Sequence, residues 1–189
     1  MAKTEISTLG EFGLIKHLTK DFPTRQPSTQ KSVGDDAAVM NFGAQRTLIT
    51  TDLLLEGIHF NLEYAPLKHL GYKAAVVNFS DIYAMNATPT QITVSLGISK
   101  RFSVEDLEEL YAGIRLACEK YNVDLVGGDT SASMTGLTIS ITCLGTAYDS
   151  DIVYRDGAKV NDLICVTGNL GTAYMGLQLL EREKVALQG

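Results

Sequence analysis

The sequence predicts an α/β (α+β) fold in which a mixed or antiparallel sheet is flanked by helices. Two segments, 66–85 and 103–121, repeat apolar residues at the three- and four-residue spacing of an amphipathic helix. Between and after them, apolar and polar residues alternate in strand-like runs such as 91–96 and 137–147. The 189 residues are enough for one sizeable domain or slightly more.

Composition and charge exclude several classes of protein. The formal net charge of −6 disfavours sequence-independent binding to nucleic acid. No apolar run approaches the roughly 20 residues of a membrane span, and the amino terminus lacks the apolar segment of a signal peptide. Cys118, Cys143 and Cys165 are widely spaced within apolar stretches, which is typical of buried thiols in a reducing compartment. We therefore expect a cytoplasmic protein without nucleic-acid or membrane partners.

The chain is organised around Gly34-Asp35-Asp36, where two adjacent carboxylates follow a glycine and precede the strand-like run 37–41. Neither acid can enter a core without a counter-charge. The segments 37–41 and 46–51 predict a hairpin. Antiparallel partners begin and end together, so Asp35 and Asp52 should reach the same end and favour a shared cation site. A solvated surface turn is the alternative for these acids.

The remaining elements follow from local patterns. A capping box at Thr8 to Glu11 predicts a helix over about 9–19. Residues 123–130 predict a short apolar strand running into Gly127, Gly128 and Asp129, where paired glycines would let backbone amides approach a phosphate. A further strand is expected at 162–167, followed by a helix from Thr172 to roughly Val185.

Asp81 interrupts the apolar stripe of the helix at 66–85. The other members of that stripe are Leu67, Leu70, Ala74, Val77 and Ala84. An acid in such a stripe is strongly unfavourable unless it is paired or bound to a metal. A buried helix-to-loop salt bridge is the alternative, but the apolar surroundings favour a functional role for Asp81.

Oxygen ligands recur at the predicted strand ends and on this helix. They are Asp35, Asp36, Thr50, Thr51, Asp52, Asp81 and Asp129. Hard oxygen donors favour Mg²⁺ over zinc or copper, and Mg²⁺ is usually held by a few carboxylates together with substrate phosphates. This pattern indicates a nucleotide and phosphoryl transfer. The sequence has neither a Walker A motif nor Gly-x-Gly-x-x-Gly, which excludes the P-loop and protein-kinase routes.

Five motifs together resemble thiamine-monophosphate kinase. They are Gly34-Asp35-Asp36-Ala37-Ala38, Thr50-Thr51-Asp52 with His59-Phe60, Asn78-Phe79-Ser80-Asp81 with Ala84-Met85, Gly127-Gly128-Asp129-Thr130, and Thr167-Gly168 with Gly171. That enzyme belongs to a superfamily with aminoimidazole ribonucleotide synthetase, selenophosphate synthetase and a hydrogenase maturation factor. The resemblance covers essentially all 189 residues but only about the first half of the family's length.

The resemblance implies phosphorylation of thiamine monophosphate by ATP, through direct in-line transfer with several Mg²⁺ ions. The positions that match metal ligands in the family are Asp35, Thr50, Thr51, Asp52, Asp81 and Asp129. The positions that match ATP contacts are Tyr111, Gly128 and Arg155, and His59 matches a contact to the thiamine substrate. No residue is assigned as catalytic, and the role of Asp36 stays open. The family also implies a homodimer whose strands form a barrel with those of a second copy.

The resemblance further implies that residues 1–150 form an ATP- and Mg²⁺-binding dimerisation domain and that 151–189 begin a truncated carboxy-terminal domain. We therefore expect weak or no kinase activity from this piece alone. Asn86 stands where the family often has glycine. Two alternatives stay open: a non-catalytic nucleotide-binding or dimerisation module, and a superfamily relative with another substrate. A selenophosphate synthetase would need a reactive cysteine near the amino terminus, and none precedes Cys118.

Overall fold

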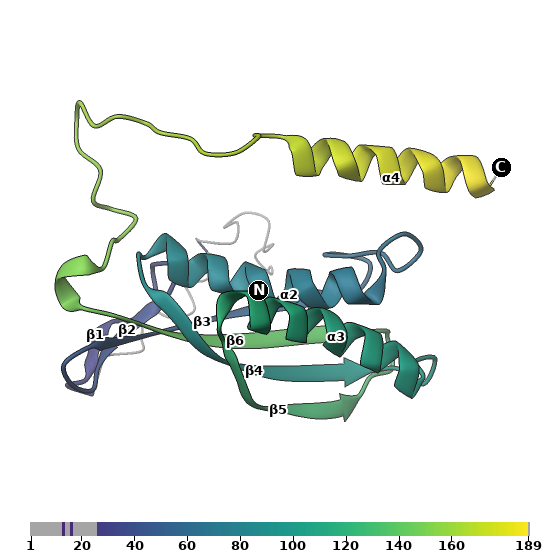
Figure 1. Cartoon of the computed structure of the whole chain (residues 1–189), viewed down its shortest axis with the longest axis horizontal. Coiled ribbons are helices and arrows are strands. Elements are labelled where there is room, and N and C mark those ends of the chain that lie inside the picture. Colours follow the sequence, from purple (N-terminus) through teal and green to yellow (C-terminus); the bar gives the residue numbers. More distant parts are fainter. Residues whose placement is uncertain (1–12, 14–15, 17–25, 189) are drawn as a thin grey trace, which may run out of the picture.

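The computed structural model describes residues 13, 16 and 26–188, and shows one six-stranded mixed sheet (Figure 1). Across the sheet, the strands are β1 (Thr29–Lys31), β2 (Ala38–Asn41), β3 (Arg46–Leu55), β6 (Thr138–Ala147), β4 (Thr88–Ile98) and β5 (Asp124–Ala132). All neighbours are antiparallel except β4 and β5, which are parallel. The expected fold class of a mixed sheet flanked by helices is confirmed, and the sheet is open rather than closed into a barrel.

Two helices cover one face of this sheet, α2 (Leu67–Ala84) and α3 (Val104–Tyr121) (Figure 1). Pro66 precedes the first turn of α2, and Ser103 with Asp106 forms a complete capping box at the start of α3. Helix α3 links the parallel strands β4 and β5, as a crossover connection must. The third described helix, α4 (Thr172–Gln188), lies outside the α2–α3 layer, beyond a short 3₁₀ turn at Asp149–Asp151 and a long extended segment (Figure 1).

The hydrophobic core lies between the sheet and the α2–α3 layer. Along β6, Ile139, Ile141 and Cys143 are buried towards the helices, while the alternate residues are half exposed on the other face. This period of two is what a strand with one covered face produces. The opposite face of the sheet carries mainly threonine and serine side chains. In one row across β3, β6 and β4, for example, Thr51 is paired with Thr142, and Thr142 with Thr93.

Helices α2 and α3 cross at two glycines. A Cβ atom on Gly71 would lie 2.0 Å from the Leu110 carbonyl oxygen, and a Cβ atom on Gly113 would lie 1.9 Å from that of Lys68. Only glycine permits backbones to approach this closely. The crossing therefore fixes the position of α2, which carries the polar residues of the site described below.

Several sequence expectations need correction. The segment 162–167 is not a strand, because none of the described strands pairs with it and an unpaired strand leaves its backbone groups unsatisfied. The short strand β1 lies in a stretch that has no strong strand pattern. Strands β3 and β5 both run past the acids expected at their ends, so Asp52 and Asp129 lie within strands. The helix expected at about 9–19 lies outside the described residues, apart from the helical Gly13 and Lys16.

Asn86 ends α2 in the left-handed conformation, with φ of 57°. Asparagine tolerates this conformation better than other residues with a side chain. Its side-chain amide also donates to the Asp151 carbonyl at 2.8 Å. The asparagine therefore performs the backbone role of a glycine at this position and adds a contact.

The three thiols differ in accessibility. Cys118 and Cys143 are buried, whereas Cys165 is exposed, and none of the three forms a disulfide. Burial, followed by the charge of Asp81, raises the pKa of the Cys143 thiol to about 12. Because the thiolate is the reactive form, Cys143 should be inert near neutral pH.

We therefore expect one thiol per chain to react quickly with an aromatic disulfide reagent at about pH 8, and three to react after denaturation. Cys165→Ser should remove the fast phase. Fast reaction of two or three thiols in the folded chain would contradict the buried positions of Cys118 and Cys143.

Candidate functional site

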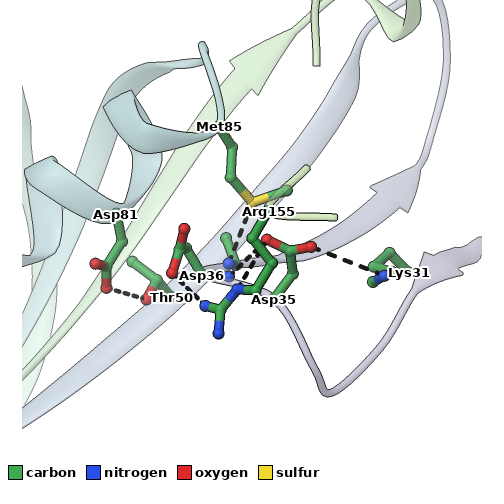
Figure 2. Close-up of polar contacts among 8 residues, drawn as sticks. Lys31, Asp35, Asp36, Thr50, Asp81, Met85 and Arg155 are labelled. Carbon is green, nitrogen blue, oxygen red and sulfur yellow. Dashed lines mark hydrogen bonds and ion pairs between the residues drawn. The ribbon is translucent and has the colours of Figure 1, made fainter. Parts of the chain in front are cut away.

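A turn before β2 presents the two adjacent acids beneath the carboxyl end of α2. Gly34 has φ of +124°, a conformation that favours glycine, and the Asp36 backbone N–H donates to Asp35 Oδ1 at 2.9 Å. The next backbone N–H, that of Ala37, donates to the Met85 sulfur at 3.2 Å. These contacts hold the acids against α2, as Figure 2 shows.

Two basic side chains neutralise this acidic turn. The Asp35 side chain is only 1% exposed, and it lies 3.6 Å from Arg155 Nε and 3.8 Å from Lys31 Nζ. Nη2 of Arg155 pairs with Asp36 Oδ1, so the guanidinium lies between the two carboxylates (Figure 2). Asp35 Oδ2 is buried and accepts no hydrogen bond from the described residues. A buried carboxylate oxygen without a hydrogen bond is unusual, and the nearby charge that faces Asp35 Oδ2 is Lys31 Nζ, at 3.8 Å.

Asp81 projects from α2 towards the same turn. The Thr50 hydroxyl of β3 donates to Asp81 Oδ2 at 2.8 Å (Figure 2). Burial is the largest influence on Asp81 and raises its pKa, and the negative charges of Asp52 and Asp36 raise it further. The Thr50 hydrogen bond and the charge of Arg155 act in the opposite direction. Three carboxylates therefore lie within electrostatic reach of one another, which is typical of functional sites.

Asp52 is anchored by the buried amide of Asn78. The Asp52 backbone N–H donates to Asn78 Oδ1 at 3.0 Å, and Asn78 Nδ2 donates to the Ala74 carbonyl at 3.0 Å. Strand alternation places Thr50 and Asp52 on the helix-covered face of β3. Burial raises the pKa of Asp52, and the nearby His59 partly offsets this rise. Asn78 thus ties α2 to β3 at the site.

Thr51 and Asp129 lie elsewhere. Thr51 is on the open face of the sheet, where its hydroxyl donates to the Ile141 carbonyl at 3.1 Å and accepts from Thr142 at 3.2 Å. Asp129 shares that face, since the register aligns it with Ser95 and, through β6, with Leu53. Three strand spacings separate β3 from β5, or about 14 Å. Within the described chain, the expected gathering of all these groups at strand ends is therefore wrong for Thr51 and Asp129.

Tyr111 lines a separate pocket of about 660 Å³ between α3 and the start of β5. Ile114, Val123 and Leu125 supply apolar walls, and Arg115 and Glu108 lie at its polar side. The pocket has the mixture of apolar walls and a few polar groups that small-molecule sites usually show.

Gly128 lies on β5 beyond the Tyr111 pocket and is required by packing. It has φ of +158°, and a Cβ atom there would lie 1.8 Å from the Val94 carbonyl oxygen of β4. Gly127 has no such restriction, because its nearest neighbour, Thr93, is 3.9 Å from the Cβ position. The absence of a side chain at Gly128 is thus explained by strand pairing alone.

His59 lies in a turn after β3, at a second pocket of about 310 Å³. The side chains of Tyr64, His69 and Lys73 also line this pocket, and Ala173 and Leu177 of α4 close one side. The Tyr64 hydroxyl donates to Glu181 of α4 at 2.6 Å. The pocket is therefore aromatic and basic, which suits a planar ligand that carries an anionic group.

The donor set beside α2 fits a hard divalent cation. Asp35, Asp52, Asp81 and Thr50 offer only oxygen, and Asp35 Oδ2 lacks a hydrogen bond. In the described part of the chain, however, no three acidic, histidine or cysteine side chains are already grouped closely enough to hold a metal ion. The guanidinium of Arg155 currently supplies the counter-charge between Asp35 and Asp36.

Sequence patterns did not predict three of the contacts in this site. Lys31 reads as a solvated charge, and neither the motif that contains Met85 nor the ATP-contact position matched by Arg155 indicated that these side chains would meet the acidic turn. The contacts of Met85 and Arg155 join residues that are far apart in the sequence, whereas Lys31 lies four residues before Asp35. Asn78 was detectable, since a polar residue one turn before Asp81 on an apolar helix is uncommon.

The fold agrees with the comparisons made against known proteins. Residues 34–147 match the family model described as AIR synthase related protein, N-terminal domain. The chain belongs to this family. The matched range begins at the glycine before the acidic turn and ends with β6, so it contains all six strands except β1.

Among curated proteins, the chain is similar to thiamine-monophosphate kinases. It is 37% identical over 179 residues to the enzyme of Aquifex aeolicus, covering 95% of this chain and 55% of that protein. It is 34% identical to the enzyme of Bacillus subtilis, covering 93% of this chain and 54% of that protein. The chain thus spans about half the length of the curated relatives it matches.

Among solved structures, the chain is similar to one described as AaThiL complexed with AMPPCP and TMP. The TM-score is 0.86 at 36% identity, covering 97% of this chain and 56% of that one. A HypE–HypF complex gives a TM-score of 0.59 at 24% identity, which shows a shared fold alone. Among the described residues, no helix is long and apolar enough to cross a membrane.

Proposed function

We propose that this chain is part of an enzyme that phosphorylates thiamine monophosphate to thiamine diphosphate with ATP, by direct in-line transfer. The observation that carries the proposal is the acidic turn, in which the buried carboxylate of Asp35 shares Arg155 with Asp36, and Asp36 lies within electrostatic reach of Asp81. A similar solved structure is described as AaThiL complexed with AMPPCP and TMP. We further propose that residues 1–150 form a domain that binds the nucleotide and Mg²⁺ and forms the dimer, and that residues 151–189 begin a second domain.

Asp35, Asp52 and Asp81, with the hydroxyl of Thr50, would hold the divalent cations. Bound Mg²⁺ supplies charge neutralisation and orientation for the phosphates of the nucleotide. Thr51 and Asp129 lie on the open face of the sheet, about 14 Å apart across three strand spacings, so each would contact an ion only at a position of its own, distinct from that of Asp81. Burial raises the pKa of Asp81 most, and the charges of Asp52 and Asp36 raise it further; a cation at this position would offset that repulsion.

Three residues are proposed to bind ATP. The pocket beside Tyr111 has apolar walls that suit a nucleotide base. Strand β5 supplies part of its wall through Leu125, and Gly128 follows on that strand. Arg155 is 41% exposed at its side chain, so it can reach a phosphate from its present position between Asp35 and Asp36. A guanidinium pairs phosphate oxygens in two places, as it pairs carboxylates.

His59 is proposed to contact thiamine monophosphate in its aromatic and basic pocket. Tyr64 lines this pocket beside His59 and would pack against a planar ring of the substrate. The pocket lies at the end of β3, the strand that also carries Asp52. A substrate in this pocket would therefore approach the proposed metal site from the His59 side.

A homodimer is proposed to form through the β5 edge of the sheet. Strand β5 is an edge with unpaired backbone groups, and Leu125 and Val126 on it are 46% and 59% exposed. Such an edge pairs readily with another strand, and a second copy would extend the sheet towards a barrel.

The unpaired thiols are consistent with the cytoplasmic location that we propose.

Calorimetric titration with a non-hydrolysable ATP analogue, with Mg²⁺ and with chelator, tests this proposal. We expect binding that requires Mg²⁺. In Arg155→Met the affinity for the analogue should fall about tenfold, the value of one charge-assisted hydrogen bond. Binding of Mn²⁺ alone should be preserved or strengthened, because the variant removes a positive charge from the acidic turn. Arg182→Met, which removes an exposed arginine of α4, should bind like the wild type.

A kinase assay with thiamine monophosphate distinguishes the alternatives. The assay should compare this chain with any longer natural form of it, using hydroxymethylpyrimidine phosphate and aminoimidazole precursors as competing substrates. Turnover of a competing substrate alone would favour a superfamily relative. Nucleotide binding without transfer in the longer protein would favour a non-catalytic module and contradict the proposed function.

A further inference from the structure

A tight turn after β3 fixes the imidazole of His59. The Gly57 N–H donates to the Phe60 carbonyl at 2.8 Å, and the His59 N–H donates to the Leu55 carbonyl at 2.9 Å. The Leu55 N–H in turn donates to His59 Nδ1 at 3.0 Å. The side chain and the backbone of His59 are therefore both hydrogen-bonded to Leu55, the last residue of β3.

This bonding selects one tautomer of the imidazole. A neutral histidine has one donor nitrogen and one acceptor nitrogen. Because Nδ1 accepts the Leu55 N–H, the proton must lie on Nε2. His59 consequently presents an N–H donor, the group that a phosphate oxygen or another anionic acceptor requires.

Lys73 connects this turn to helix α2. Its Nζ donates to the His59 carbonyl at 2.8 Å, and both residues line the pocket of about 310 Å³. Lys73 lies two residues after Gly71, where α2 is held against α3 by the close backbone contact. The His59 carbonyl is thus hydrogen-bonded to helix α2, close to the point where α2 contacts α3.

We propose that Lys73 is a positioning residue, which holds the His59 turn so that Nε2–H faces an anionic substrate in this pocket. The proposal rests on the proposed role of His59 in binding thiamine monophosphate. Lys73 acts through the His59 carbonyl, and the Leu55–Nδ1 bond transmits that restraint to the ring. Without the lysine, the turn can rotate and both tautomers of the imidazole become accessible.

Nuclear magnetic resonance of the ¹⁵N-labelled chain measures the tautomer directly. Two-bond ¹H–¹⁵N correlations should be recorded at about pH 8.5, well above the ordinary imidazole pKa. The sequence has only three histidines, so His59→Gln identifies the His59 signals. We expect the Nε2–H form in the wild type and in Lys73→Arg, and averaged shifts in Lys73→Met. Lys68→Met is the matched control, since it removes an exposed lysine from the same helix.

Binding of thiamine monophosphate separates positioning from direct contact. Lys73→Met should weaken the affinity about tenfold, as for one charge-assisted hydrogen bond, while Lys73→Arg and Lys68→Met should not. In a His59→Gln background, Lys73→Met should cause no further loss if Lys73 acts through His59. A kinetic assay on the longer protein should show the same pattern in KM.

The outcomes distinguish the two proposals. An unchanged His59 tautomer in Lys73→Met overturns the positioning role, and so do losses of affinity that add in the double variant. If the wild type does not bind thiamine monophosphate at all, the proposed function fails, while the tautomer measurement still decides whether Lys73 positions His59.

Discussion

Asp81→Asn is expected to abolish most Mg²⁺-dependent nucleotide binding while leaving the folded chain intact. The asparagine oxygen can still accept the 2.8 Å hydrogen bond from Thr50, so the contact between α2 and β3 is kept. The charge that Asp81 would offer to a divalent cation is lost. Removing a buried charged partner costs about 3 kcal/mol, which corresponds to roughly a hundredfold in affinity.

The stability of this variant provides a second, independent measurement. The pKa of Asp81 is raised in the folded chain, chiefly by burial and then by Asp52 and Asp36. Its protonated form therefore favours folding, and this contribution is lost as the pH rises from the ordinary aspartate pKa through the raised value. In Asp81→Asn that loss is absent. Denaturation in chelator should show equal or higher stability than the wild type at neutral pH.

Asp162→Asn is the matched control for Asp81→Asn. Asp162 is exposed and accepts a hydrogen bond from the Lys159 N–H at 2.7 Å, far from α2 in the sequence. It should bind Mg²⁺ and nucleotide like the wild type. Equal nucleotide affinity in Asp81→Asn and Asp162→Asn would show that Asp81 is a structural acid rather than a metal ligand.

Gly71→Ala and Gly113→Ala are expected to destabilise the fold by about 3 kcal/mol or more each. The added Cβ atoms would lie 2.0 Å and 1.9 Å from carbonyl oxygens of the facing helix. A backbone oxygen cannot rotate away as a side chain can, so the two helices must separate. The gain in helix propensity, about 1 kcal/mol, is too small to offset this.

Gly176→Ala in α4 is the control for these substitutions. No atom lies within 4 Å of a Cβ atom at Gly176, so only the favourable change in helix propensity remains. Chemical denaturation should therefore show stability equal to or above that of the wild type. If Gly71→Ala behaved like Gly176→Ala, the close crossing of α2 and α3 would be wrong, and with it the rigid support that we infer for Lys73.

Local patterns in the sequence predicted the elements that have strong periodicity. Helices α2 and α3, strand β6 and the β2–β3 hairpin all agree with the structure, because each depends on residues that are close in the sequence. The expected strand at 162–167 failed for the opposite reason. Whether an apolar run becomes a strand depends on a neighbouring strand, and local pattern does not supply one.

The sequence alone determined that this chain has a mixed sheet flanked by helices and that its acids include an exceptional one, Asp81. Only the tertiary structure decided which acids meet. Adjacent strand residues point to opposite faces, so Thr50 joins Asp81 while Thr51 faces the open side. The pairing of Arg155 with Asp36 spans 119 residues of sequence. Such contacts depend on register and helix packing, which arise only when distant segments fold together.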